Sequence, residues 1–91
     1  MSSLGRIESV NDLRERLRVQ LATLSDGKLS AEAIDPAAGL LDHGYLDSLS
    51  AATFLAQIEE EYGIEITEVD LVGRLASLEA LARHLHREGP A

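Results

Sequence analysis

The chain has 91 residues and a net charge of −8, and 45% of its residues are hydrophobic but only 3% aromatic. A chain of this length folds as one small domain, and its aliphatic core favours helices over sheets. Between Asp26 and Asp70 the sequence contains eleven acidic residues and a single basic one, Lys28. This excess of negative charge argues against nucleic-acid binding and favours partners with a basic surface. With no cysteine, disulfides, thiolate metal sites and a built-in thiol nucleophile are excluded.

No apolar run is long enough to cross a membrane, and the first ten residues lack the apolar stretch of a signal peptide. We therefore expect a monomeric cytoplasmic protein without membrane insertion. It should form a single domain over residues 1–91, with an ordered core over about residues 8–88.

A first helix is predicted after Ser9, because aliphatic residues recur there at intervals of three and four. Its stripe consists of Val10, Leu13, Leu17, Leu21 and Leu24. Ser9 can cap the start of this helix, and Asp12 lies in its first turn, where the helix dipole favours an acidic side chain. Asp26 and Gly27 should end the helix.

Residues 28–47 show no helical period and contain Pro36, Gly39 and Gly44. A connection of about twenty residues is unusual in a domain this small, so it either hides a short helical turn or has a function of its own. We expect its aliphatic side chains to anchor it to the bundle: Ile34, Leu40, Leu41 and Leu46.

From Ser48 the helical period returns, and Gly63 should end this second helix. Its core face is predicted to contain Ala51, Phe54, Leu55, Ile58 and Tyr62. The opposite face carries small apolar and neutral polar groups where charge is usual: Leu49, Ala52, Thr53, Ala56, Gln57 and, as its one acid, Glu60. An apolar strip of Leu49, Ala52 and Ala56 beside Ser48 suggests a docking surface.

Two further helices complete the pattern. Thr67 and Asp70 form a cap-like pair at the start of a short third helix, and Ser77 should cap the last one. We expect Val69, Val72 and Leu75 to face inward in the third helix, and Leu78, Leu81, Ala82 and Leu85 to do so in the last. Gly89 and Pro90 should close the last helix. The predicted fold is all-α, a small four-helix bundle with three longer helices, a short third helix and a long first loop.

Ser48 is the strongest candidate for a functional residue. As a helix N-cap it would need no further role. A hydrolase nucleophile is disfavoured, because the frame is not Gly-x-Ser-x-Gly and the nearby loop residue His43 has no evident orienting partner. A hydroxyl at a helix N-terminus is, however, well placed to carry a phosphate group. Ser48 therefore has the features of a site that is modified more than those of one that catalyses.

No metal site is expected. His84 and His86 stand two residues apart on a helix and so point in nearly opposite directions; we interpret both as solvated residues near a helix C-terminus. Asp42 and Asp47 lack the ladder of acids and the glycine of a calcium loop.

The stretch "GYLDSLSAATFLAQIEEEYGIEI" resembles the Asp-Ser-Leu motif and following helix of acyl carrier proteins. The likeness extends to the upstream pair Asp35 and Pro36, the approach "LLDHGY" and the closing "LASLEALARHL". It covers nearly the whole chain, more loosely in the first helix. The motif together with the long first loop is far more specific than the three residues alone.

The resemblance implies that the chain is a carrier and not an enzyme. In that family a phosphopantetheinyl transferase, using Mg²⁺, moves 4′-phosphopantetheine from coenzyme A onto the motif serine, here Ser48, and Asp47 would help the transferase engage it. The thiol at the end of the arm then carries an acyl or aminoacyl group as a thioester. The reactive thiol thus comes from the prosthetic group, which would explain why the chain needs no cysteine. Partners would read the second helix through Leu49, Ala52, Ala56, Glu59 and Glu60. They would include a loading ligase or adenylating enzyme and downstream synthases, transferases or tailoring enzymes.

Departures from subfamily patterns narrow the role. Fatty-acid carriers usually bear acids two and five residues after the serine, where this chain has Ser50 and Thr53. Peptidyl carriers usually read Gly-Gly-His-Ser, which Asp47 does not match. The approach from Gly44 to Ser48 is similar to free-standing aminoacyl carriers, including the D-alanyl type. These features favour a specialised pathway of fatty-acid, polyketide or nonribosomal-peptide type. The alternative is a small helical interaction module that binds a basic partner and is never modified.

Overall fold

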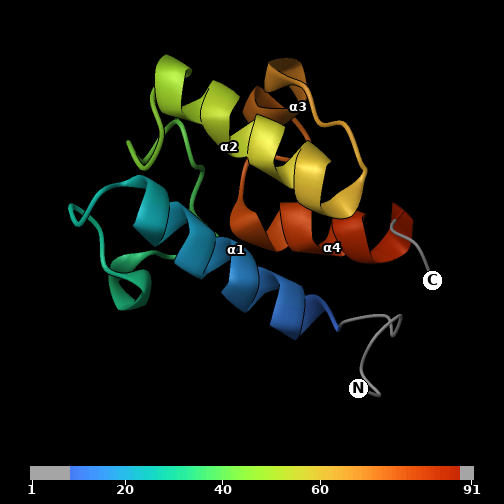
Figure 1. Ribbon diagram of the computed structural model, residues 1–91, viewed down its shortest axis with the longest axis horizontal. Coiled ribbons are helices and arrows are strands. Elements are labelled where there is room, and N and C mark those ends of the chain that lie inside the picture. The colour runs from blue at the N-terminus through green and yellow to red at the C-terminus, as the bar shows by residue number, and fades with distance from the viewer. Residues whose placement is uncertain (1–8, 89–91) are drawn as a thin grey trace.

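The structure is a computed structural model that describes residues 9–88. Within this range the chain is all-helical, with four α-helices and one short 3₁₀ helix (Figure 1). The elements are α1 (Val10–Leu24), η1 (Ala31–Ala33), α2 (Ser48–Tyr62), α3 (Glu68–Val72) and α4 (Leu78–Glu88). The predicted four-helix bundle with a short third helix is therefore confirmed.

Helices α1 and α4 form the main packing pair of the bundle (Figure 1). The predicted aliphatic stripes are buried in both, from Leu13, Leu17 and Leu21 in α1 to Leu81 and Leu85 in α4. The caps predicted at Ser9 and Ser77 are present: each hydroxyl accepts a backbone N–H three residues on, at 3.0 and 3.1 Å.

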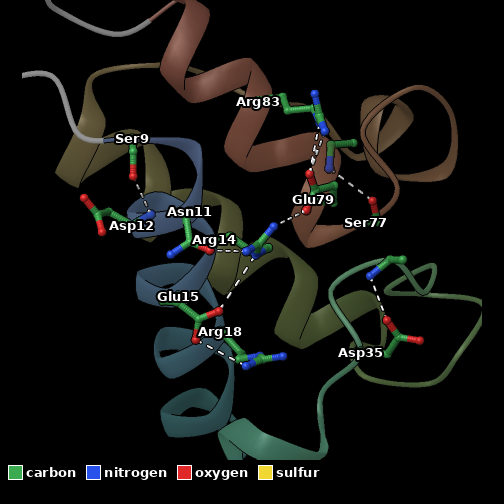
Figure 2. A network of polar contacts seen from close by, with 12 residues as sticks. Ser9, Asn11, Asp12, Arg14, Glu15, Arg18, Asp35, Ser77, Glu79 and Arg83 are labelled. Carbon is green, nitrogen blue, oxygen red and sulfur yellow. Dashed lines mark hydrogen bonds and ion pairs between the residues drawn. The ribbon is translucent and has the colours of Figure 1, made fainter.

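An ion pair also joins these two helices. Arg14 donates to Glu79 at 2.7 Å across the interface, and Arg83 donates to the other oxygen of the same carboxylate at 3.0 Å (Figure 2). The hydrogen bond from Arg14 is the main reason why the pKa of Glu79 is lowered. This carboxylate therefore fixes how α1 and α4 face each other, at a partly exposed site where its contribution to stability is modest.

His84 corrects one expectation, since it is buried with only 9% of its surface exposed. The buried stripe of α4 is wider than the aliphatic residues indicate, because His84 lies beside Leu81 and Leu85 on the side that packs into the bundle. Its Nδ1 atom has no hydrogen-bond partner within residues 9–88. His86, in contrast, is exposed as expected.

Helix α2 buries the face that its period predicts. Ala51, Phe54, Leu55 and Ile58 are buried, and Tyr62 is partly buried. The helix ends at Gly63, which adopts the left-handed conformation at φ 72° and donates its N–H to the Glu59 carbonyl at 2.8 Å. Because glycine adopts this conformation without a steric penalty, the predicted end of α2 is confirmed.

Helix α3 begins as predicted but faces differently. Thr67 and Asp70 form a reciprocal capping box. Leu71 and Leu75 are buried, whereas Val69 and Val72 are 76% and 70% exposed, so the prediction that both valines face inward is wrong. A helix of five residues has too few turns for its apolar positions to define a face, and Leu71 takes the inward position instead.

The connection between α1 and α2 contains a short helical turn, η1, which was one of the two alternatives that its length suggests. Its anchors are confirmed: Ile34, Leu40 and Leu46 are buried, and Leu41 is partly buried. No helix in the described part of the chain is long and apolar enough to span a membrane. The cytoplasmic location, the single-domain organisation over residues 1–91 and the monomeric state stay predictions. Gly89 and Pro90 lie outside the described residues.

Candidate functional site

The connection between α1 and α2 is held in its middle by backbone hydrogen bonds to residues at the start of α4. The carbonyl of Pro36 accepts the Glu79 N–H at 2.9 Å, and the Leu40 N–H donates to the Ala76 carbonyl at 2.7 Å. The first of these bonds satisfies a backbone N–H at the N-terminus of α4, where helices lack internal acceptors. The loop is thus part of the bundle and not a free tether.

Tyr45 fixes the same connection closer to Ser48. Its hydroxyl accepts the Asp35 N–H at 2.9 Å and lies 3.4 Å from the Ala33 carbonyl, to which it can donate. Gly44 supplies the preceding turn with φ 79°, and the Leu46 N–H donates to the Leu40 carbonyl at 3.1 Å. The backbone that enters α2 is therefore held on both sides.

We expect Tyr45→Phe to lower the free energy of unfolding by about 1 kcal/mol, because it removes the acceptor of the Asp35 N–H. Urea unfolding measures this loss, and hydrogen exchange should show faster exchange of the Asp35 amide. Unchanged exchange at Asp35 would contradict the role given to this hydroxyl.

Asp47 and Ser50 form the cap of α2. One Asp47 carboxylate oxygen accepts the Ser50 N–H at 2.9 Å, and the Ser50 hydroxyl accepts the Asp47 N–H, also at 2.9 Å. Donation from the Ser50 backbone, followed by that from its hydroxyl, lowers the pKa of Asp47. Asp47 therefore presents a negative charge at the start of α2 at neutral pH.

Ser48 lies at the first helical position of α2, so the interpretation of its hydroxyl as the N-cap is wrong. Its side chain is exposed, and its hydroxyl takes part in no hydrogen bond with the residues that the structure describes. The capping task falls to Asp47 because the Ser50 side chain completes a reciprocal box with it. The Ser48 hydroxyl is consequently available for chemistry.

The predicted docking strip lies along the outer face of α2. Leu49 is 80% exposed, and Ala52 and Ala56 are exposed one and two turns further on. Glu59 and Glu60 are also exposed, and neither forms an ion pair within residues 9–88. The five residues expected to contact partners thus share one accessible face, apolar near Ser48 and acidic at the far end.

Candidate catalytic and metal-binding groups do not gather around Ser48. His43 is exposed and its ring lies 5.0 Å from that of Tyr45 between centroids. Among the described residues, no group of three or more His, Asp or Glu side chains is placed to hold a metal ion. The described part of the chain thus offers an accessible hydroxyl and no base that is hydrogen-bonded to it.

The family model for the phosphopantetheine attachment site matches residues 27–85, more than half of the chain. The chain belongs to this family. The match spans the long connection, α2, α3 and most of α4, and it agrees with the resemblance to acyl carrier proteins. No curated protein matches the chain. Members of the phosphopantetheine attachment family are carrier domains that hold 4′-phosphopantetheine covalently on a serine.

The residues at the start of α2 fit such a group. A phosphodiester on the Ser48 hydroxyl would lie at the N-terminus of a helix of 15 residues, where the helix dipole favours negative charge. The hydroxyl is accessible and unengaged, and the neighbouring Asp47 carboxylate is already satisfied by the Ser50 N–H. No rearrangement of the cap is needed to accommodate the attachment.

Proposed function

We propose that this phosphopantetheine attachment domain is a carrier whose attachment site is Ser48. The observation that supports it best is the accessible Ser48 hydroxyl at the first position of α2, inside the matched segment and freed from capping by Asp47. When attached, the arm supplies a terminal thiol that holds an acyl or aminoacyl group as a thioester. The chain itself contributes the nucleophilic oxygen and its orientation.

Asp47 is proposed to guide the phosphopantetheinyl transferase to this oxygen. Its carboxylate precedes Ser48 directly, is held rigidly by Ser50 and keeps its charge because its pKa is lowered. A cationic group or a bound Mg²⁺ in the transferase would complement that charge. No group within residues 9–88 forms a hydrogen bond with the Ser48 hydroxyl through which it could take the proton, so we assign that proton transfer to the transferase.

The outer face of α2 is proposed as the surface that later partners read. These are a loading ligase or adenylating enzyme, followed by synthases, transferases or tailoring enzymes. Ser50 and Thr53 stand where fatty-acid carriers usually bear acids; Ser50 completes the cap, and the Thr53 hydroxyl lies 3.4 Å from the Leu49 carbonyl. The first two turns of α2 after Asp47 therefore carry no charge on this face. Because partners of fatty-acid carriers usually meet acids there, this difference supports a specialised pathway with its own set of partners.

We expect Leu49→Asp to reduce transfer from the loaded carrier to its partner about tenfold, because it places a charge in the centre of an apolar contact. Steady-state turnover with the loaded variant measures this effect. Val72→Asp is the matched control, since Val72 is similarly exposed but lies on α3. Equal turnover for Leu49→Asp and the wild type would remove Leu49 from the interface.

The alternative function is an unmodified interaction module that binds a basic partner through the same acidic chain. Treatment with coenzyme A and a broad-specificity transferase distinguishes the two, because only the carrier gains mass.

A further inference from the structure

A groove of about 600 Å³ lies between α1 and α2, far along α2 from Ser48. Four residues of α1 and four of α2 line it, and we call it the α1–α2 groove: Glu15, Arg16, Val19 and Gln20, and Gln57, Glu60, Glu61 and Tyr62. It arises because α1 packs mainly on α4 and contacts α2 only sparsely. A hydrogen bond from Gln20 to Gln57 at 3.0 Å links the two helices within the groove.

The α1–α2 groove combines apolar surface with negative charge. Val19 lines it with 56% of its surface exposed, and Tyr62 lines it as well. Three acids, Glu15, Glu60 and Glu61, and one base, Arg16, contribute a net charge of −2 (one minus three). The chain thus leaves an aliphatic side chain uncovered inside an acidic rim.

Two of the three acids that line the groove have ion-pair partners. Arg16 is held by Glu61 and lies 5.5 Å from the centre of the Tyr62 ring, so its charge is already engaged. Glu15 is paired with Arg18 at 3.2 Å. Glu60 lines the groove and has no ion-pair partner within residues 9–88, so its carboxylate is open to a cationic group of a partner.

We propose that the α1–α2 groove docks an amphipathic helix of a partner protein, with aliphatic side chains against Val19 and lysine or arginine beside Glu60. A seam between two helices suits a third helix, and the acidic rim selects basic flanks and disfavours nucleic acid or an anionic lipid surface. Ala56 and Glu60 occupy successive turns of α2, so the groove continues the strip beside Ser48. The inference deepens the proposed carrier function by giving its partners a second contact.

The test uses the full chain and a synthetic fourteen-residue helix of leucine and lysine, with leucine at helical spacing on one face. Fluorescence anisotropy of the labelled peptide measures its affinity, and amide chemical shifts locate its binding site. We expect Val19→Lys to weaken binding at least tenfold, because it adds a like charge at the centre of the contact. Val69→Lys, the same change at an exposed valine on α3, should alter the affinity less than twofold.

The remaining outcomes are equally decisive. Equal losses in the two lysine variants, or equal binding of a peptide with glutamate in place of lysine, would overturn the proposal in favour of unspecific attraction. Peptide-induced shifts confined to the Leu49 strip would also overturn it. Shifts at Val19 and Gln57 on loading the arm, without any from the peptide, would assign the groove to the carrier's own cargo. The Ser48→Ala variant should bind the peptide as the wild type does, so the groove and the attachment site can fail independently.

Discussion

Replacement of Ser48 by alanine is expected to abolish attachment of phosphopantetheine while leaving the fold intact. The substitution removes only the hydroxyl of Ser48. That side chain is exposed, and its hydroxyl forms no hydrogen bond with the described residues. The free energy of unfolding should therefore change by less than about 0.5 kcal/mol. Intact mass after incubation with coenzyme A, Mg²⁺ and the transferase measures attachment, and urea unfolding measures stability.

Ser50→Ala is the matched control for this experiment. It removes a hydroxyl two residues away that accepts the Asp47 N–H, so it should cost about 1 kcal/mol of stability yet leave the chain able to accept the arm. Ser48→Ala should therefore lose attachment but keep its stability, whereas Ser50→Ala should lose stability but keep attachment. Attachment to Ser48→Ala, or its loss in a folded Ser50→Ala, would show that the attachment site is assigned to the wrong serine.

Neutralising Asp47 is expected to slow attachment at least about tenfold in kcat/KM, because a charged contact with the transferase is worth about 1.5–3 kcal/mol. Asp47→Asn tests the charge alone, since asparagine caps helices nearly as well as aspartate. Asp47→Ala removes the cap too and should lower the free energy of unfolding by about 1 kcal/mol. Initial rates of attachment and urea unfolding of both variants separate recognition from stability. An Asp47→Asn chain loaded at the wild-type rate would remove Asp47 from recognition.

The difference in stability between the wild type and Asp47→Asn should depend on pH. The pKa of Asp47 is lowered in the folded chain, chiefly by the Ser50 N–H, below the value of about 3.9 expected when unfolded. Its charge-dependent stabilisation is therefore present above about pH 4 and is lost as the pH falls through the folded pKa. Glu79, whose pKa is also lowered, contributes equally to wild type and Asp47→Asn and cancels in their difference. That difference should shrink on acidification; a difference that stays constant down to the lowest pH at which both fold would contradict it.

Much of the fold could be predicted because the longer helices repeat their buried positions over several turns. Leu13, Leu17 and Leu21 in α1 define a face that no other secondary structure would produce. The five residues of α3 offer no such repetition, so its apolar pattern predicts the wrong side for Val69. His84 is also buried on α4, because the buried face of that helix is wider than its stripe of aliphatic residues indicates.

The sequence indicates a position for the candidate site, which stays a prediction, but not how the cap beside it is built. Asp47 and Ser48 are both residue types that cap helices, and only the reciprocal bonds with Ser50 select Asp47. A sequence signal existed in the serine three residues after Asp47, which resembles the spacing of a capping box. The α1–α2 groove had no such signal, because it depends on how two helices separated by a long connection come to lie against α4.

The most direct test of the account is the intact mass of the wild-type chain before and after incubation with coenzyme A, Mg²⁺ and a broad-specificity phosphopantetheinyl transferase, followed by fragmentation of the product. We expect a gain of one phosphopantetheine, located on Ser48. A folded chain that gains no mass while a known carrier is converted in parallel, or that carries the group on another residue, would contradict it.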